Sequence, residues 1–408
     1  AFPLGNGHLG AMPYGRLCEE RILINHERLW YDGVRPELPD ISALLPKCRE
    51  LLAKGDVLAA NELYNDALGV QDDEEGDCAV YHPAADLTFS STCEERFKNY
   101  QRYLDLEAGE AMTYWEWHNR PQVRRSFVSR ADNCIVVEQL GCGVKAHPWE
   151  LKIELHELID AIRKHGELFI PQIEFTSVAK GEWLVGTGRY TDPSYNGAEY
   201  GVVARVISSD RGSIKPSKCG QSLIVDGMQE LMIIAMVFVY EPAEKAIERC
   251  QQKILALGTD YDALLQRHVA LHGKLFNSCR VQFGDSSAGL GSTNEALLLH
   301  AYNGTTSIEL LQKMTDYGRY LLIGSADQQS VPSNLQGIWN GDYAPPWDCF
   351  FMINENLLMN YWQAMPGGMH AEALGVFNFY ESNVGEYREN AQKLFGCRGI
   401  FIPALTSP

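Results

Sequence analysis

The sequence predicts a multidomain β + α protein in which a strand-rich region is followed by helices. Its 408 residues suffice for two to four domains at about 100 to 200 residues each. Short apolar or alternating runs separated by Gly, Pro, Asn and Asp indicate strands in the first part, whereas apolar residues recur with helical spacing in the second. We expect a β domain at 1–240, a helical linker at 241–289 and a helical domain at 290–408.

The individual elements follow from the local pattern. Strands are expected at 21–25, 111–117, 124–128, 134–140, 202–208 and 230–239. Many strands at short spacing favour stacked antiparallel sheets, and one helical insertion at 41–67 interrupts them before Gly69. Helices are expected within 241–276, with a break around Gly258, and at 295–302, 307–323, 357–364 and 371–389. The intervening loop of about 30 residues is much longer than most loops, which indicates a functional role.

Composition and charge exclude several classes of protein. The chain has 45% hydrophobic and 22% charged residues, as ordinary globular proteins do. Its net charge of −18 repels phosphate backbones and anionic membranes, and the longest apolar run, 231–240, is half of what a membrane span needs. We therefore expect neither nucleic acid nor a membrane as a partner.

The eleven cysteines are scattered without a C-x-x-C pair. This pattern favours reduced core thiols over a disulfide framework or a zinc site, and with it a cytoplasmic enzyme. The histidines show no metal-ligand spacing either. We expect no metal and no cofactor.

The long loop has the composition of a carbohydrate pocket. Between residues 339 and 362 it carries seven aromatic residues, namely Trp339, Tyr343, Trp347, Phe350, Phe351, Tyr361 and Trp362, interleaved with Asn, Gln and Asp. Aromatic faces suit sugar C–H surfaces, and amides suit hydroxyls. The alternative is an aromatic core with Asn354 capping the following helix.

Successive motifs carry a resemblance to a known family. They are AFPLGNGHLGAMPYG at 1–15, LINHERLW at 23–30, SNLQGIW at 333–339, PPWD at 345–348 and NENLLMNYW at 354–362. Over its whole length the chain resembles glycoside hydrolase family 95, known for 1,2-alpha-L-fucosidases and alpha-L-galactosidases. The resemblance implies an N-terminal β-supersandwich, a helical linker and the first part of an (α/α)6 barrel. Because the rest of such a barrel would lie beyond Pro408, we expect the missing C-terminal part of the chain as a partner.

The resemblance also implies site residues. Asn354 and Asn356 match the two family asparagines that hold the attacking water, while the general-acid Glu and the base Asp would lie downstream of residue 408. In an extended segment these two amides would share one face. Substrate-binding residues are expected at Trp347, Asp348, Met352, Asn334, Gln336 and Trp339. Residues 6–8 either cross to the barrel mouth or form a plain hairpin turn.

Two departures from the family pattern affect the prediction of which sugar the protein binds. Met352 replaces a pocket histidine, and 401–406 replaces a His-Asn-Thr-Asp run. The leading hypothesis is an inverting exo-glycosidase that removes alpha-linked L-fucose or a related L-sugar from an oligosaccharide substrate. The alternatives are a non-hydrolytic carbohydrate-binding homologue of the same fold and, third, a glycan phosphorylase, although no basic anion site is visible in the loop.

Overall fold

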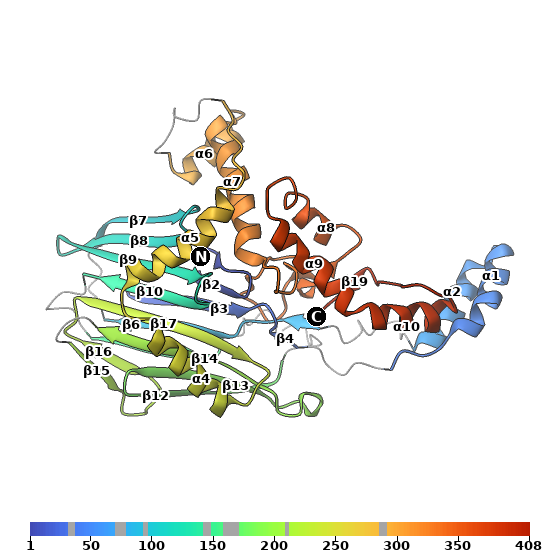
Figure 1. Ribbon diagram of the computed structural model, residues 1–408, viewed down its shortest axis with the longest axis horizontal. Helices are drawn as coiled ribbons and strands as arrows, with labels where there is room; N and C mark the ends of the chain where they lie inside the picture. Colours follow the sequence, from blue (N-terminus) through green and yellow to red (C-terminus); the bar gives the residue numbers. More distant parts are fainter. Residues whose placement is uncertain are drawn as a thin grey trace.

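The first part of the chain forms two stacked β-sheets, and the second part is helical (Figure 1). The computed structural model describes residues 1–31, 37–69, 79–92, 97–141, 148–157, 171–208, 212–284 and 292–408. Cysteines 78, 93 and 142 lie outside these ranges. A β-sandwich followed by helices is the coarse architecture that we expected.

All strand pairs in the two large sheets are antiparallel. In spatial order, the first sheet contains β1 (Leu4–Gly5), β2 (Leu9–Pro13), β3 (Glu19–His26), β6 (Ala85–Ser91), β11 (Trp149–Glu154), β16 (Leu223–Asp226) and β15 (Ser213–Pro216). The second contains β12 (Ile173–Lys180), β13 (Trp183–Tyr190), β14 (Glu199–Ser208), β17 (Glu230–Val239), β10 (Cys134–Leu140), β9 (Arg120–Ser129), β8 (Glu110–Trp117) and β7 (Phe97–Asp105). The six strands expected from the sequence are confirmed.

Strand β17 is buried on both faces, which explains why its apolar run is uninterrupted. Ile233 and Ala235 face the core between the two sheets, whereas Ile234 and Phe238 face a second core on the outer side. Helices α4 (Ala243–Ala256) and α5 (Tyr261–Phe276) cover that outer side (Figure 1). A strand buried on both faces needs apolar residues at every position.

The helices begin and end at recognisable signals. The side chain of Asp260 accepts a hydrogen bond from the backbone of Ala263 and caps α5, and Gly258, at φ 86°, separates α4 from α5. In the same way Ser307 caps α7 (Ile308–Ser325), and Thr293 caps α6 (Asn294–Tyr302). The predicted break at Gly258 is confirmed.

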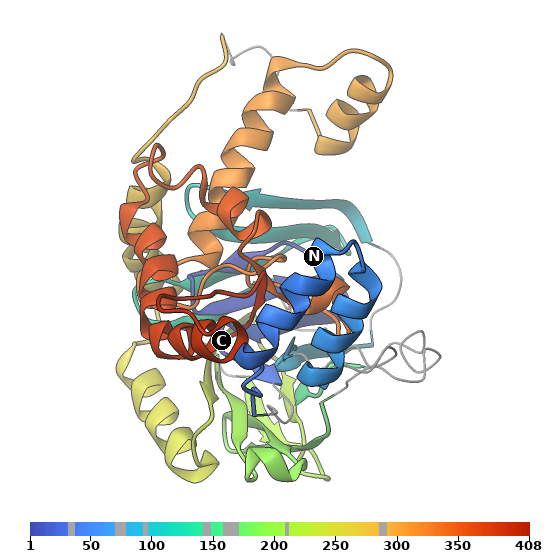
Figure 2. The ribbon, with the colours of Figure 1, turned by 90° about the vertical axis from the view of Figure 1, so that its right-hand side faces the viewer.

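The helical insertion of the β domain contains η1 (Ser42–Leu44), α1 (Leu45–Ala53) and α2 (Val57–Leu68), and it ends at left-handed Gly69, as expected. In both ribbon views α1 and α2 lie beside α10 (Val384–Phe395) (Figures 1 and 2). The backbone N–H of Ile41 donates to Lys393 O at 3.0 Å. The insertion therefore links the β-sandwich to the end of the helical part.

The helical part differs from the prediction in one place. We expected a single helix at 371–389, but α9 (His370–Ser382) and α10 are separate helices that meet at Asn383. The shorter elements are α8 (Asn356–Tyr361), η2 (Pro193–Tyr195), η3 (Pro346–Cys349) and two strand pairs, β4 (Trp30–Tyr31) with β5 (Val80–Tyr81) and β18 (Phe351–Met352) with β19 (Leu405–Thr406). None of the described helices is long and apolar enough to span a bilayer.

The cysteine prediction is partly wrong. Four free cysteines, Cys48, Cys134, Cys250 and Cys349, are buried as expected, and Cys219 and Cys397 are exposed. Cys18, however, is disulfide-bonded. Because disulfides are typical of oxidising compartments, cysteine usage does not support the cytoplasmic location that we expected.

Candidate active site

The long loop after α7 is anchored on the first β-hairpin. The indole Nε1 of Trp339 donates to Leu4 O at 2.7 Å, and the ring packs beside Gly5 and Gly324. Only 8% of the Trp339 surface is exposed. We predicted Trp339 as a sugar-binding residue, but its burial between the two parts of the molecule gives it a structural role.

Asn334 is likewise structural. It is 4% exposed, its side-chain Oδ1 accepts from the backbone N–H of Gln336 at 2.8 Å, and its backbone pairs with Gly337, whose φ is 75°. These contacts build a tight turn that a side-chain amide stabilises locally. The prediction that Asn334 contacts sugar does not fit this burial, whereas the half-buried Gln336 remains accessible.

Buried polar groups then hold the loop against the β-sandwich. Asn25 Nδ2 donates to Asn340 O at 2.9 Å, and the Tyr81 hydroxyl donates to Ile338 O at 2.7 Å. Asn340 in turn donates to Tyr81 O and Asp342 O. Since buried backbone groups need partners, these side chains set the path of the loop.

Residues 347–349 have an unusual backbone. Trp347, Asp348 and Cys349 have φ values of 51°, 50° and 63°, a region that non-glycine residues avoid. Cys349 is buried at the base of this turn, while Trp347 is 70% exposed. Strained backbone of this kind concentrates at ligand sites. Trp347 is therefore exposed on a strained turn with Asp348 beside it, and the contact of both residues with a sugar stays a prediction.

The segment that carries the two asparagines follows a small β-ladder. Phe351 pairs with Thr406 and Met352 with Leu405. Phe351 is buried, and Met352 and Leu405 lie on the more exposed side. The two regions that depart from the family pattern are thus directly opposite each other.

Asn354 and Asn356 are both exposed, and within the described ranges neither side chain forms a hydrogen bond. The extended segment that we predicted is wrong: residues 353–355 form a turn, and Asn356 begins α8. The alternative role of Asn354 as helix cap is also wrong, since Glu355 occupies that position without a side-chain capping bond. Both amides are open to a ligand, but through a turn rather than a strand face.

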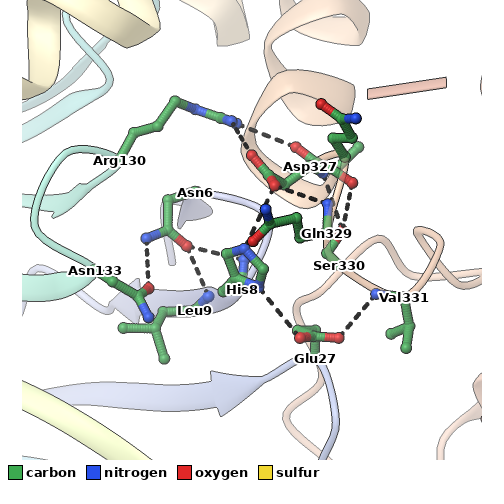
Figure 3. Close-up of polar contacts among 12 residues, drawn as sticks. Asn6, His8, Leu9, Glu27, Arg130, Asn133, Asp327, Gln329, Ser330 and Val331 are labelled. Carbon is green, nitrogen blue, oxygen red and sulfur yellow. Dashed lines mark hydrogen bonds and ion pairs between the residues drawn. The ribbon is translucent and has the colours of Figure 1, made fainter. Parts of the chain in front are cut away.

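A charged cluster joins the β-sandwich to the start of the same loop (Figure 3). We call it the interdomain cluster; it consists of His8, Glu27, Arg130 and Asp327. His8 lies between two carboxylates, with Nδ1 3.2 Å from Glu27 Oε1 and Nε2 3.5 Å from Asp327 Oδ1. Arg130 approaches the other Asp327 oxygen at 3.2 Å, and Glu27 Oε2 accepts from the backbone of Val331 at 2.9 Å.

Residues 6–8 do cross to the helical part. They form the turn between β1 and β2, and the Gly7 N–H donates to Gly324 O at 2.9 Å. The predicted hairpin turn is confirmed, and it also contacts the end of α7, whereas its position at the mouth of a barrel stays a prediction. Sequence reasoning missed Glu27, Arg130 and Asp327, because no local pattern links positions 300 residues apart.

The charges in this cluster reinforce one another. Burial of the His8 imidazole opposes its protonation, but hydrogen bonds to Asp327 and Glu27 outweigh that effect and raise its pKa to about 9. The hydrogen bond from His8 lowers the pKa of Asp327 to about 2. Although burial alone would raise the pKa of Glu27, its bond to His8 holds it below the ordinary range. His8 is therefore a cation between two anions at neutral pH.

This arrangement predicts a pH window for stability. The contribution of His8 to the free energy of unfolding is complete below its unfolded pKa of 6.5 and is lost as pH rises through about 9. The contribution of Asp327 is complete above its unfolded pKa of 3.8 and is lost as pH falls through about 2. We expect the free energy of unfolding to fall above pH 6.5, and His8→Gln to flatten that alkaline decline. Chemical denaturation between pH 5 and 10 tests this; identical profiles for both proteins would contradict it.

No three His, Cys, Asp or Glu side chains in the described part of the chain are arranged to hold a metal ion. The chemistry available on the loop is that of neutral amides, the exposed indole of Trp347, the half-buried carboxylates of Asp342 and Asp348 and the exposed carboxylate of Glu355.

Comparison with known proteins identifies the class. The family model for the glycosyl hydrolase family 95 catalytic domain matches residues 260–408, and the model for the glycosyl hydrolase family 65 N-terminal domain matches residues 1–238. Both models describe domains of glycosyl hydrolases. The match to the family 65 N-terminal domain covers more than half of the chain, so the chain belongs to the proteins that carry this domain, and its second part is similar to the family 95 catalytic domain.

Curated relatives agree with this. The chain is 25% identical to Alpha-L-fucosidase 2 of Arabidopsis thaliana over 423 residues, which cover 98% of this chain and 49% of that protein. It is 24% identical to Probable alpha-fucosidase A of Aspergillus oryzae (strain ATCC 42149 / RIB 40), covering 98% of this chain and 56% of that protein. The chain thus spans about half the length of the curated relatives it matches.

A solved structure shares the fold. A putative kojibiose phosphorylase from human microbiome superposes with a TM-score of 0.52 at 11% identity and covers 99% of this chain and 47% of that one. At this identity the likeness concerns the fold alone.

Proposed function

We propose that the whole protein is an inverting exo-glycosidase that removes alpha-linked L-fucose or a related L-sugar from oligosaccharides. The observation that carries the proposal is the pair of exposed amides, Asn354 and Asn356, on a loop of a family 95 catalytic domain. The names of the curated relatives, which are fucosidases, support the sugar class.

In the proposed mechanism the two asparagines act on the attacking water. A neutral amide cannot take its proton, but the carbonyl oxygen accepts a hydrogen bond and orients the water lone pair toward the anomeric carbon. Inversion also needs an acid on the glycosidic oxygen and a base for the water. By resemblance, both come from the part of the protein beyond residue 408.

The domain assignment is part of the proposal. We assign residues 1–240 to the β-supersandwich, 241–289 to the linker and 290–408 to the first part of an (α/α)6 barrel. The change from β17 to α4 falls at Val239 and Ala243, which supports the first boundary. In the pocket we retain Trp347, Asp348, Met352 and Gln336, and omit Asn334 and Trp339 because they are buried.

The sugar pocket is expected to have an apolar wall. Met352 lies directly opposite Leu405, so the two departures from the family pattern form one surface beside the asparagines. A thioether cannot donate a hydrogen bond and is only a weak acceptor. A sugar hydroxyl that a histidine would bind therefore has no partner on this surface.

We accordingly expect weaker hydrolysis of fucosides than of another alpha-linked L-glycoside, and Met352→His to raise kcat/KM for fucosides by about tenfold, equivalent to about 1.4 kcal/mol. The assay compares alpha-L-fucosides, alpha-L-galactosides and plant oligosaccharides, with Met359→His as control because Met359 is an exposed methionine on α8. Efficient fucoside hydrolysis that Met352→His does not change would remove Met352 from the specificity site. No hydrolysis of any glycoside would favour the carbohydrate-binding homologue.

A further inference from the structure

A large cavity lies between the β-sandwich and the helical part. Its volume is about 970 Å³, at the upper end of the roughly 300–1,000 Å³ typical of ligand sites. The β-sandwich contributes Trp30, Tyr195 and Tyr240, and the helical part contributes the segment 328–331, one face of α9 and Pro408. None of the eight site residues predicted from the sequence lines it.

Two tyrosine rings in this cavity are held in place from behind. Tyr195 stacks on Tyr31 with centroids 4.7 Å apart and planes 9° apart. The Tyr240 hydroxyl accepts from the Trp30 backbone N–H at 3.1 Å and donates to the Trp30 carbonyl. Both rings remain partly exposed on the cavity side. Rigid aromatic faces bind apolar surfaces at a low entropic cost.

The opposite wall offers amides. Gln328 and Gln329 are exposed, and in the part of the chain that the structure describes their side chains have no hydrogen-bond partner. Asn378 Nδ2 donates to Gln328 O at 3.1 Å, and within the described residues its Oδ1 accepts no hydrogen bond. Each amide can donate and accept, as sugar hydroxyls require.

The lining carries little charge. Arg28 is the one charged side chain among the described lining residues, and its Nε lies 3.2 Å from Glu27 Oε1, the carboxylate oxygen that also contacts His8. Rigid aromatic faces and free amides beside a single cation match a neutral glycan better than a polyanion or a cation.

We propose that this interdomain cavity binds a neutral oligosaccharide at a site additional to the loop that carries Asn354 and Asn356. The choice of a glycan rests on the proposed function, whereas occupation of the cavity does not require hydrolysis. Since both parts of the molecule line the cavity, such a ligand also bridges them.

The test measures binding and hydrolysis separately in the full-length protein. The probe is lacto-N-tetraose, a neutral tetrasaccharide without a terminal L-sugar, and its sulfated derivative serves for comparison. Calorimetry measures the binding of each probe to the protein. Gln329→Trp fills the cavity and should weaken binding of the neutral probe about tenfold. Met314→Trp is the matched control and should change it less than about twofold, since Met314 is an exposed residue of α7 that does not line the cavity. Asn378→Trp provides a second filling variant should the first unfold.

Hydrolysis gives the independent readout. Both filling variants should raise KM for long oligosaccharide substrates and leave that for a small aryl glycoside unchanged. The proposal would be overturned if the neutral probe did not bind, or if the filled variants bound it as tightly as the unsubstituted protein. Tighter binding of the sulfated probe than of the neutral probe would also overturn it. Binding without hydrolysis of any glycoside would instead refute the proposed function and leave the cavity site standing.

Discussion

Replacing Asn356 by Ala in the whole protein is expected to lower kcat by about two to three orders of magnitude, with little change in KM. The amide orients the attacking water, which becomes a reactant only in the transition state, so its loss costs kcat rather than ground-state binding. Removal of one positioned polar group of this kind typically costs about 2.7 to 4 kcal/mol. Asn354→Asp should have a similar effect, because a carboxylate still accepts from the water but places a negative charge beside it and changes its orientation.

Glu355→Ala is the matched control for both variants. Glu355 lies between the two asparagines, is exposed, and makes no side-chain capping bond to α8. Steady-state kinetics on one glycoside with all four proteins separates the roles. Equal kcat in the asparagine variants and the control would rule out the water-holding role.

Gly5→Ala is expected to destabilise the folded protein by about 3 kcal/mol, at the upper end for overpacked interiors. A Cβ on Gly5 would lie 2.3 Å from the Gly324 carbonyl oxygen and 3.2 Å from the Trp339 ring, and both neighbours belong to the helical part. A backbone carbonyl cannot move aside as a flexible side chain can. The substitution should therefore separate the loop that carries the site from the β-sandwich.

Gly318→Ala tests whether this effect is local. Gly318 lies inside α7, and a Cβ there meets nothing within 4 Å. Because alanine favours a helix over glycine by about 0.5–1 kcal/mol, this control should be neutral or stabilising. Urea denaturation compares the two, and a Gly5→Ala protein as stable as the control would mean that the close contact does not hold the two parts together.

The fold could be predicted from local patterns because its main elements obey them. Strand β17 was predicted from its apolar run and the α4–α5 break from Gly258, since both signals are local in the sequence. The break at Asn383 was missed because apolar residues keep helical spacing across it, although Ser382, Asn383 and Gly385 are residues that favour helix ends. The disulfide at Cys18 was missed because spacing alone does not reveal pairing between distant cysteines.

The site was predictable in composition but not in geometry. The exposed Trp347 and the two asparagines follow from motif and composition. Trp339 carries the same aromatic signal, yet it is buried because Gly5 and Gly324 leave room for its ring. The interdomain cluster joins residues from four distant segments, and only the folded chain brings them together.

The configuration of the first released sugar tests the proposed function most directly. Proton NMR during the first minutes of hydrolysis, before mutarotation, distinguishes the anomers of the product. If water held by Asn354 and Asn356 attacks the anomeric carbon opposite the leaving group, the whole protein should release the β-anomer first from an alpha-linked L-glycoside. Release of the α-anomer first would mean a covalent intermediate on the enzyme and would contradict the role of the two asparagines.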